Sequence, residues 1–413
     1  MNTRKTEKTT NSRLFNKGIL PVAVATAMFG AGVASAADFY LTNDATIDNQ
    51  TGGNATTNYI VNQNATLSTN GSMSVYYGTI DGQGGVASGR GGTVTIGGNL
   101  TMHGNIGATN ATGNFTISEW NSLTLASNVS TFNSDNMTLS DNTVLNFGNV
   151  TSGYNRGSSE TLTFASNITM GSNSTINVGN GTTLNGNIYG TSNGAGTLNV
   201  LGNFTSTGSI GAAQVDGADF ITSGLEQINI SKGNTFTLNN NATATRMNIN
   251  GTVTVAGNIT AAVTMGADGI LNLNNESGDD NAAKVVGAIQ SYVAGTAQGT
   301  LNINGTFTTQ GAIGQGGKGL AAINLSNSTW ANGFTTTFAH NVNATTITLG
   351  TSTSHNNATL QITAGGTQGG VNIAVTGNII GGGNATSIDN AAGGIFLVSG
   401  NATVNGSIGT SDN

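Results

Sequence analysis

The sequence has no cysteine, one proline and few charged residues among its 413 positions. The absence of cysteine excludes disulfide bonds, thiol nucleophiles and cysteine metal sites. Charged residues make up 7% of the chain, whereas about a quarter is usual for soluble domains. The net charge is -7 and only 11 residues are basic. Because no basic face is available to neutralise phosphates, we expect no nucleic-acid partner.

Small polar residues take the place of the missing ones. Glycine contributes 63 residues, and asparagine, threonine and serine fill many of the other positions. These residue types weaken the interior of a helix. They suit short strands that are joined by frequent turns. The composition therefore favours an all-β protein with many corners.

The first 36 residues differ from the rest of the chain. Basic residues from Arg4 to Lys17 precede an apolar run, GILPVAVATAMFGAGVA, which leads into ASA immediately before Ala37. A positive start, a short apolar centre and small residues at the exit are typical of a secretory signal peptide. A transmembrane anchor fits less well because the run is short and rich in Gly and Ala. We predict a signal peptide over residues 1–36 and an exported chain from Ala37.

One phrase of sixteen residues occurs four times without a gap. The copies are GTVTIGGNLTMHGNIG, GTLNVLGNFTSTGSIG, GTLNINGTFTTQGAIG and GIFLVSGNATVNGSIG, starting at Gly92, Gly196, Gly299 and Gly394, so that their spacings are 104, 103 and 95 residues. Four glycines, one threonine and one isoleucine are shared by all copies. The chain is thus predicted to consist of about four units of about a hundred residues. We assign residues 37–91 to N-terminal capping rungs and a first partial unit. Residues 92–413 form the repetitive body, truncated in its fourth unit.

Within the phrase, apolar and polar residues alternate as in a half-buried strand. Leu301 and Ile303 share one face, and Thr300 and Asn302 share the other. Gly305 is expected to break this strand. Short strands, frequent corners and unit repetition predict a right-handed parallel β-helix, or β-solenoid, with about 22 residues per rung. An array of β-sandwiches is the rival architecture.

The histidines give no pattern of a catalytic or metal site. His103 lies inside the first phrase, where the other copies have Thr207, Gln310 and Asn405. We interpret it as an outward corner residue. His340 and His355 are not at metal-ligand spacing from it or from each other.

Two further stretches are candidate binding sites. Glu276, Asp279 and Asp280 in NNESGDD offer carboxylates for weak calcium binding, but the spacing matches no calcium loop, and a solvated loop is the preferred interpretation. The segment GAIGQGGKG resembles a phosphate loop, but Ala312 stands at the first glycine and Gly319 at the magnesium-binding hydroxyl. We therefore expect no catalytic, cofactor-binding or metal-binding residues, and no cofactor.

Several of these features resemble bacterial autotransporter passenger domains. They are the basic signal peptide, the uncharged cysteine-free chain, and phrases followed by LEQINIS at 225 or LAAINLS at 320. Among passenger domains, the chain is similar to the repetitive surface antigens of the outer-membrane protein B type. The resemblance covers residues 37–413, and its motifs identify no active site.

The resemblance implies an exported protein displayed at the outer membrane or released, which adheres to host-cell or surface receptors and glycans as a virulence factor. It also implies a C-terminal translocator barrel or a separate transporter. The stretch up to Asn413 has no alternating barrel strands, so we interpret the chain as an N-terminal piece of a longer protein or a truncated gene. The expected function is a non-catalytic adhesin or surface antigen. The alternatives are a secreted β-helical polysaccharide-degrading enzyme and a surface-layer protein.

Overall fold

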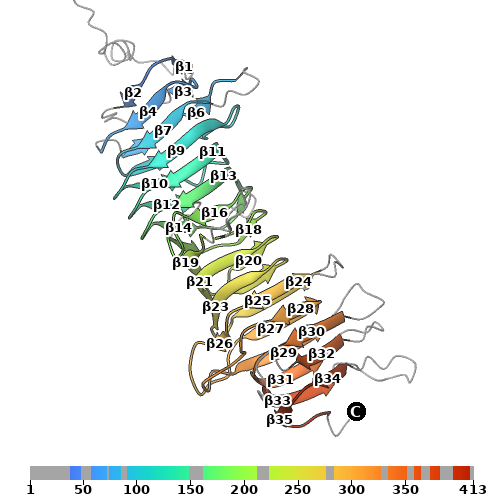
Figure 1. Cartoon of the computed structure of the whole chain (residues 1–413). Helices are drawn as coiled ribbons and strands as arrows, with labels where there is room; N and C mark the ends of the chain where they lie inside the picture. Colours follow the sequence, from blue (N-terminus) through green and yellow to red (C-terminus); the bar gives the residue numbers. More distant parts are fainter. Residues whose placement is uncertain are drawn as a thin grey trace, which may run out of the picture.

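A computed structural model describes residues 38–47, 57–71, 74–84, 91–147, 161–211, 223–275, 283–326, 334–350, 358–363, 373–381 and 394–409. These residues form strands β1 to β35 and no helix. Hydrogen bonding joins the strands into a three-stranded sheet and two long parallel sheets of 15 and 17 strands. Figure 1 shows the strands following one another along an elongated stack. The predicted signal peptide lies outside the described residues.

The strand pairing confirms the predicted parallel β-helix. Strands from successive rungs run parallel, as in the pairings of β14 with β17 and of β17 with β19. A β-sandwich pairs its strands antiparallel, so the rival architecture is wrong. Neighbours in space are separated by one rung of chain, 22 residues between Asn177 and Asn199 and 30 between Asn199 and Asn229.

The strands lie on three faces of the coil. Face one contains β2 (Ala45–Ile47), β4 (Thr66–Thr69), β7 (Thr93–Ile96), β9 (Thr112–Ile117), β16 (Ile188–Gly190), β25 (Ala283–Val286), β28 (Phe307–Thr309), β30 (Phe334–Phe338), β32 (Ala358–Thr363) and β34 (Ile395–Ser399). Face two contains β5 (Val75–Tyr76), β8 (Leu100–Met102), β10 (Ser122–Leu125), β12 (Val144–Phe147), β14 (Thr175–Val178), β17 (Thr197–Val200), β19 (Leu225–Ile230), β26 (Ile289–Ser291) and β35 (Ala402–Asn405). Face three contains β1 (Asp38–Leu41), β3 (Asn58–Val61), β6 (Ile80–Gly82), β15 (Thr182–Leu184), β18 (Phe204–Ser206), β20 (Thr235–Leu238), β22 (Thr252–Val255), β24 (Ile270–Asn275), β27 (Thr300–Gly305) and β29 (Leu320–Ser326).

Six longer strands cross a corner and belong to two faces each. They are β11 (Thr131–Leu139), β13 (Leu162–Met170), β21 (Ala242–Ile249), β23 (Ile259–Met265), β31 (Val342–Leu349) and β33 (Ile373–Gly381). The register shifts at the bend in each pair, between Asn133 and Asn136, between Thr243 and Arg246, and between Asn343 and Thr346. A β-bulge at the bend lets each of these strands turn the corner without ending.

Each copy of the repeated phrase folds into two short strands and one β-bridge. The strands are β7 and β8, β17 and β18, β27 and β28, and β34 and β35, and the bridges are at Ile106, Ile210, Ile313 and Ile408. The structure thus confirms the alternation of strand and corner. Gly305 is a partial correction, because β27 includes it, with a φ of 112°.

Successive copies of the phrase start on successive faces. The first strand of the phrase is on face one in β7, on face two in β17, on face three in β27 and on face one again in β34. One unit therefore spans a whole number of turns of the coil and then one further face. Each copy starts one face after the copy before it. Equivalent residues of different copies consequently point to different sides of the coil.

The inside of the coil is a continuous apolar core. Inward positions are occupied by Leu, Ile, Val, Phe and Met, most of them with no exposed surface. Aromatic rings stack across rungs, with 4.2 Å between the ring centroids of Phe132 and Phe164 and 5.2 Å between those of Phe204 and Phe236. Because parallel strands repeat the same inward position in every rung, each apolar side chain packs on its counterparts above and below.

Rung length varies more than the sequence indicates. The predicted value of about 22 residues holds between Asn302 and Asn324. The interval falls to 17 residues between Asn241 and Asn258, and rises to 36 between Thr359 and Ile395. Length changes are tolerated at corners because loop closure costs little extra free energy as a loop grows.

Replacing Phe164 by alanine tests the stacked core. Phe164 has no exposed surface and contacts the rings of both Phe132 and Phe147. We expect Phe164→Ala to lower the free energy of unfolding by about 3–5 kcal/mol, measured by urea unfolding. Thr163→Ala, next in sequence and exposed, should change it by less than about 0.5 kcal/mol. Equal effects of the two substitutions would contradict this packing.

Candidate functional surface

Amide side chains on face two form a hydrogen-bonded ladder across successive rungs. Each amide nitrogen donates to the side-chain oxygen of the preceding rung, over distances between 2.8 and 3.0 Å. The members of this face-two amide ladder are Thr124, Asn146, Asn177, Asn199, Asn229 and Asn248. A shorter ladder on face three joins Thr254, Asn272, Asn302 and Asn324. Both ladders lie along the strands rather than at the corners.

Corner asparagines make a different contact. The side-chain oxygens of Asn203 and Asn258 accept backbone N–H groups of Thr235 and Lys284 in the next rung, at 3.0 and 2.7 Å. Backbone groups at a corner have no strand partner, and a buried unpaired group is costly. The abundance of asparagine thus has two structural causes, one in the strands and one at the corners.

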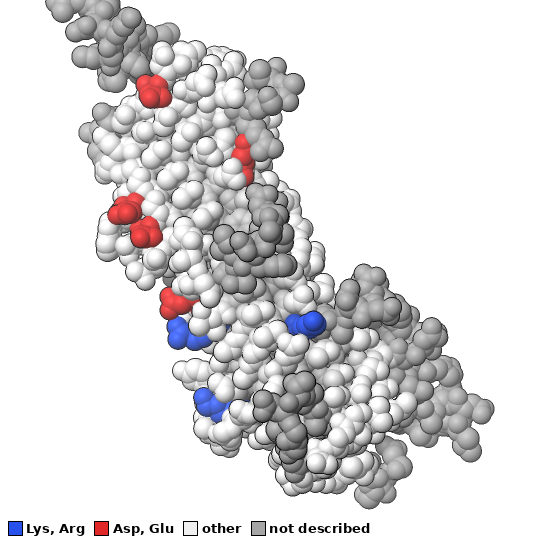
Figure 2. All heavy atoms as spheres, in the orientation of Figure 1, with Lys and Arg blue, Asp and Glu red and all other residues white. Residues whose placement is uncertain are grey.

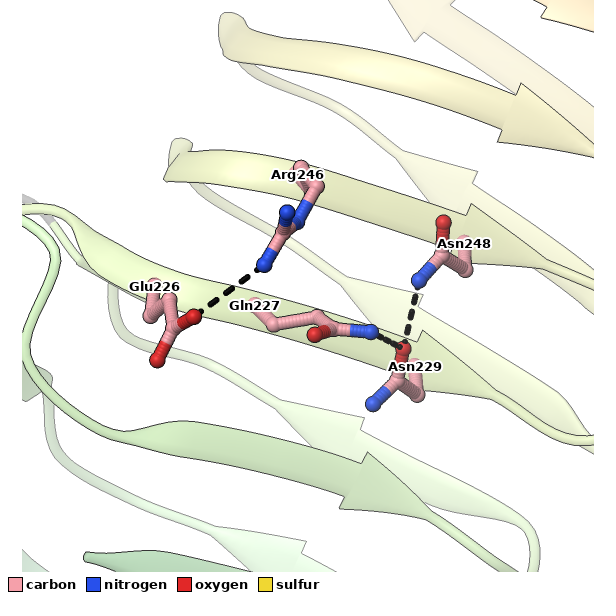
Figure 3. Close-up of polar contacts among 5 residues, drawn as sticks. All are labelled: Glu226, Gln227, Asn229, Arg246 and Asn248. Atoms are coloured by element: carbon pink, nitrogen blue, oxygen red, sulfur yellow. Dashed lines mark hydrogen bonds and ion pairs between the residues drawn. The ribbon is translucent and has the colours of Figure 1, made fainter. Parts of the chain in front are cut away.

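The face-two amide ladder has a direction and an open end. Every donor points toward the N-terminal side, so Asn248 donates to Asn229 at 2.8 Å (Figure 3). The next residue in register is Thr264, and among the described residues no donor reaches the Asn248 side-chain oxygen. Aligned hydrogen bonds polarise one another, which strengthens each by about 10–30%. The ladder therefore ends in a strengthened acceptor that faces solvent.

A shallow groove of about 370 Å³ opens at this end of the ladder. Most of its lining residues have amide, hydroxyl or aromatic side chains, and the full set is Asn229, Ile230, Ser231, Asn248, Asn250, Thr264, Gly266 and Tyr292. Gly266 lies in register between Asn250 and Tyr292, because Met265 pairs with Ile249 and Ser291. A side chain at Gly266 would meet the Asn250 amide. The absence of a side chain at Gly266 therefore leaves room for the Asn250 amide beside it.

Tyr292 forms one wall of the groove with a fixed backbone. Its side chain is 71% exposed, and its backbone N–H donates to the Met265 carbonyl at 2.8 Å. The neighbouring Ser291 N–H donates to the Lys318 carbonyl at 3.0 Å, and the Ser291 hydroxyl donates to the Val293 carbonyl at 2.9 Å. These bonds hold the start of the loop on two adjacent rungs, so the ring is presented from a rigid support.

Two ion pairs flank the groove, and within each pair the cation and the carboxylate neutralise each other. Arg246 Nη2 lies 3.1 Å from Glu226 Oε1, beside the ladder end (Figure 3), and Lys232 Nζ lies 2.7 Å from Asp268 Oδ2, on the other side. The hydrogen bond from Lys232 to Asp268, together with the Asp268 charge, raises the pKa of Lys232. Figure 2 shows how few other charged side chains the visible face carries. The groove itself is lined only by uncharged residues.

The structure separates the histidines and the equivalent phrase residues. His103 stacks on Tyr77 with 4.6 Å between ring centroids, and its Nδ1 lies 3.3 Å from the Asn128 side-chain oxygen. It follows β8 on face two, whereas Thr207 follows β18 on face three and Gln310 follows β28 on face one. Asn405 ends β35. His340 is exposed, and His355 lies outside the described residues.

Only one of the other two candidate stretches lies within the described residues. Glu276, Asp279 and Asp280 lie outside the described residues. The glycine-rich segment around Lys318 is a corner loop whose carbonyls bind the preceding rung, as in the bond from Gly295 N–H to Gly317. No helix follows it, so the phosphate-loop geometry is missing. Within the described residues, no group of three or more His, Asp or Glu side chains is placed to hold a metal ion.

Comparison with known proteins gives no relative: no family model, curated protein or solved structure matches this chain. Among the described residues, no helix has the length and apolar character needed to cross a membrane. The candidate surface therefore has to be assessed from its own geometry.

Trp120 is another exposed aromatic residue, and it stands at a corner of the coil. It has a φ of 64° and is 74% exposed. Asn142 and Asn173, each with a φ of 57°, stand at the same corner in the next two rungs. Asparagine tolerates this left-handed conformation, whereas it is an outlier for a bulky residue. Strain of this kind clusters at functional sites. Trp330, the other tryptophan, lies outside the described residues.

Exchanging Trp120 for the residue used in the next rungs tests this strain. We expect Trp120→Asn to raise the free energy of unfolding by about 1 kcal/mol, measured by urea unfolding. Trp120→Ala removes the indole, but alanine is also disfavoured at positive φ. It should therefore give little or no gain in the free energy of unfolding. If both variants are no more stable than the parent, the backbone at this corner is not strained.

Proposed function

We propose that this chain is an exported bacterial cell-surface or secreted protein that acts as a non-catalytic adhesin or surface antigen, similar to autotransporter passenger domains. The observation that carries the proposal is the outer surface of the β-helix. It presents columns of amide and hydroxyl groups on successive rungs, such as Asn199, Asn229 and Asn248 on face two and Asn272 and Asn302 on face three. A rigid array of this kind offers many weak polar contacts to a partner.

The rotation of the repeated phrase supports an adhesive function. Outward residues of different copies lie on different sides of the coil, so the repeat displays similar groups all round rather than one concentrated reactive site. Several weak contacts on one particle can add to a firm attachment by multivalency. Partners in this proposal are host-cell or surface receptors and glycans, and nucleic acid is not among them. Export uses a C-terminal translocator barrel or a separate transporter.

An attachment assay tests this function. Beads coated with the mature chain are expected to bind glycan-bearing animal cells in a saturable way, counted by flow cytometry. Because few charges are available, attachment should be nearly the same at about 0.15 M and about 0.5 M salt. Absence of saturable attachment would contradict the proposal. Release of reducing sugar from cell-surface polysaccharide would favour the enzyme alternative, and ordered sheets in electron micrographs would favour a surface-layer protein.

A further inference from the structure

We propose that the groove at the end of the face-two amide ladder is a binding subsite for a neutral hexopyranose unit of a glycan. The groove is formed by Asn248, Asn250, Thr264, Gly266 and Tyr292 with the ladder residues beside them. This inference rests on the proposed adhesive function and adds the site and the ligand class.

The shape of the groove fits one sugar ring. Its volume of about 370 Å³ is near the lower end of the range for small-molecule sites, about 300–1,000 Å³. The Asn250 amide lies beside Gly266, and Tyr292 is in register with Gly266 in the next rung. A hexopyranose has one face of C–H groups that can pack on an exposed aromatic ring. Tyrosine supplies such a contact at small entropy cost because it has only two side-chain torsions.

The polar groups of the groove match hydroxyl groups. The Asn248 side-chain oxygen is the unfilled acceptor at the end of the ladder, and a sugar hydroxyl is a suitable donor. Asn250, Thr264 and Ser231 add groups that both donate and accept. Hydroxyls have the same dual capacity, whereas a carboxylate only accepts. The end of the ladder therefore favours a hydroxyl over a carboxylate.

The charges around the groove also select an uncharged ligand. The two cations of the flanking ion pairs are already partnered, Arg246 with Glu226 and Lys232 with Asp268. An anionic ligand would have to compete with these carboxylates for the cations. A neutral sugar requires no such exchange, and it is recognised by the uncharged lining alone.

Saturation-transfer NMR with the full chain tests the subsite. The probes are methyl β-D-glucopyranoside, methyl β-D-galactopyranoside and methyl α-D-mannopyranoside, with methyl β-D-glucuronide as the charged counterpart. At least one neutral hexoside is expected to bind saturably and more tightly than the glucuronide. Tyr292→Ala should weaken binding roughly tenfold or more by removing the stacking surface. Tyr292→Phe should retain binding within about twofold, because stacking remains. Gly266→Asn should abolish binding, because a side chain at this position would displace the Asn250 amide from the groove.

Tyr77→Ala is the matched control, since Tyr77 is an exposed tyrosine elsewhere on the coil and its loss should leave hexoside binding unchanged. Circular dichroism of each variant checks that the fold is intact. Binding of none of the three neutral hexosides, or equal binding by the parent and Tyr292→Ala, overturns the subsite. If beads coated with Tyr292→Ala attach to cells as well as beads coated with the parent, the subsite is contradicted and the adhesive function is not. If the parent itself does not attach, the adhesive function falls whether or not hexosides bind.

Discussion

Parallel pairing between successive rungs is the constraint on which this structure depends. A single rung has too few apolar side chains to offset the conformational entropy of ordering its backbone. Stacking adds inter-strand hydrogen bonds and buries the edges of each rung, so the rungs are stable only together. The stacked phenylalanines and the two amide ladders are both consequences of this register. The register places side chains of the same kind at the same position in consecutive rungs, both inside and outside the coil.

The same constraint explains where the surface can acquire a specific site. A perfectly regular ladder satisfies its own hydrogen bonds, so it offers a partner many weak contacts but no single specific site. The groove arises where regularity fails on face two: Thr264 replaces an asparagine in register, Gly266 has no side chain, and Tyr292 projects from the following rung. Trp120 is a comparable interruption at a corner that otherwise carries asparagine. All four residues lie between copies of the repeated phrase, and the phrase itself is scaffold.

The alternation of single residues was enough to predict the strands of the fold. Leu301 and Ile303 are buried and Thr300 and Asn302 are not, as the sequence indicates. The rotation of the phrase could not be predicted, because it depends on how many strand positions separate two copies. That number is hidden by β-bulges such as the one between Asn343 and Thr346, where one strand serves two faces.

The candidate site could not be predicted from the sequence, for a related reason. Asn248, Gly266 and Tyr292 are distant in sequence and meet only when the register of three rungs is known. The one local signal is that Tyr292 continues the alternation after Ile289 and Gln290 and so is predicted to point outward. Trp120 carries a similar signal once it is aligned with Asn142 in the next rung.

Disulfide trapping tests the register and the rotation together, since the chain has no cysteine of its own. Asn302 is in register with Asn272 on face three. Neighbouring strands are about 4.8 Å apart, within the Cα separation of about 4.4–6.8 Å that a disulfide spans. The account predicts that the double variant Asn272→Cys with Asn302→Cys forms a disulfide on mild oxidation, and that Thr264→Cys with Asn302→Cys does not, because Thr264 is on face two. The opposite result would place the third phrase on the wrong face and contradict the account.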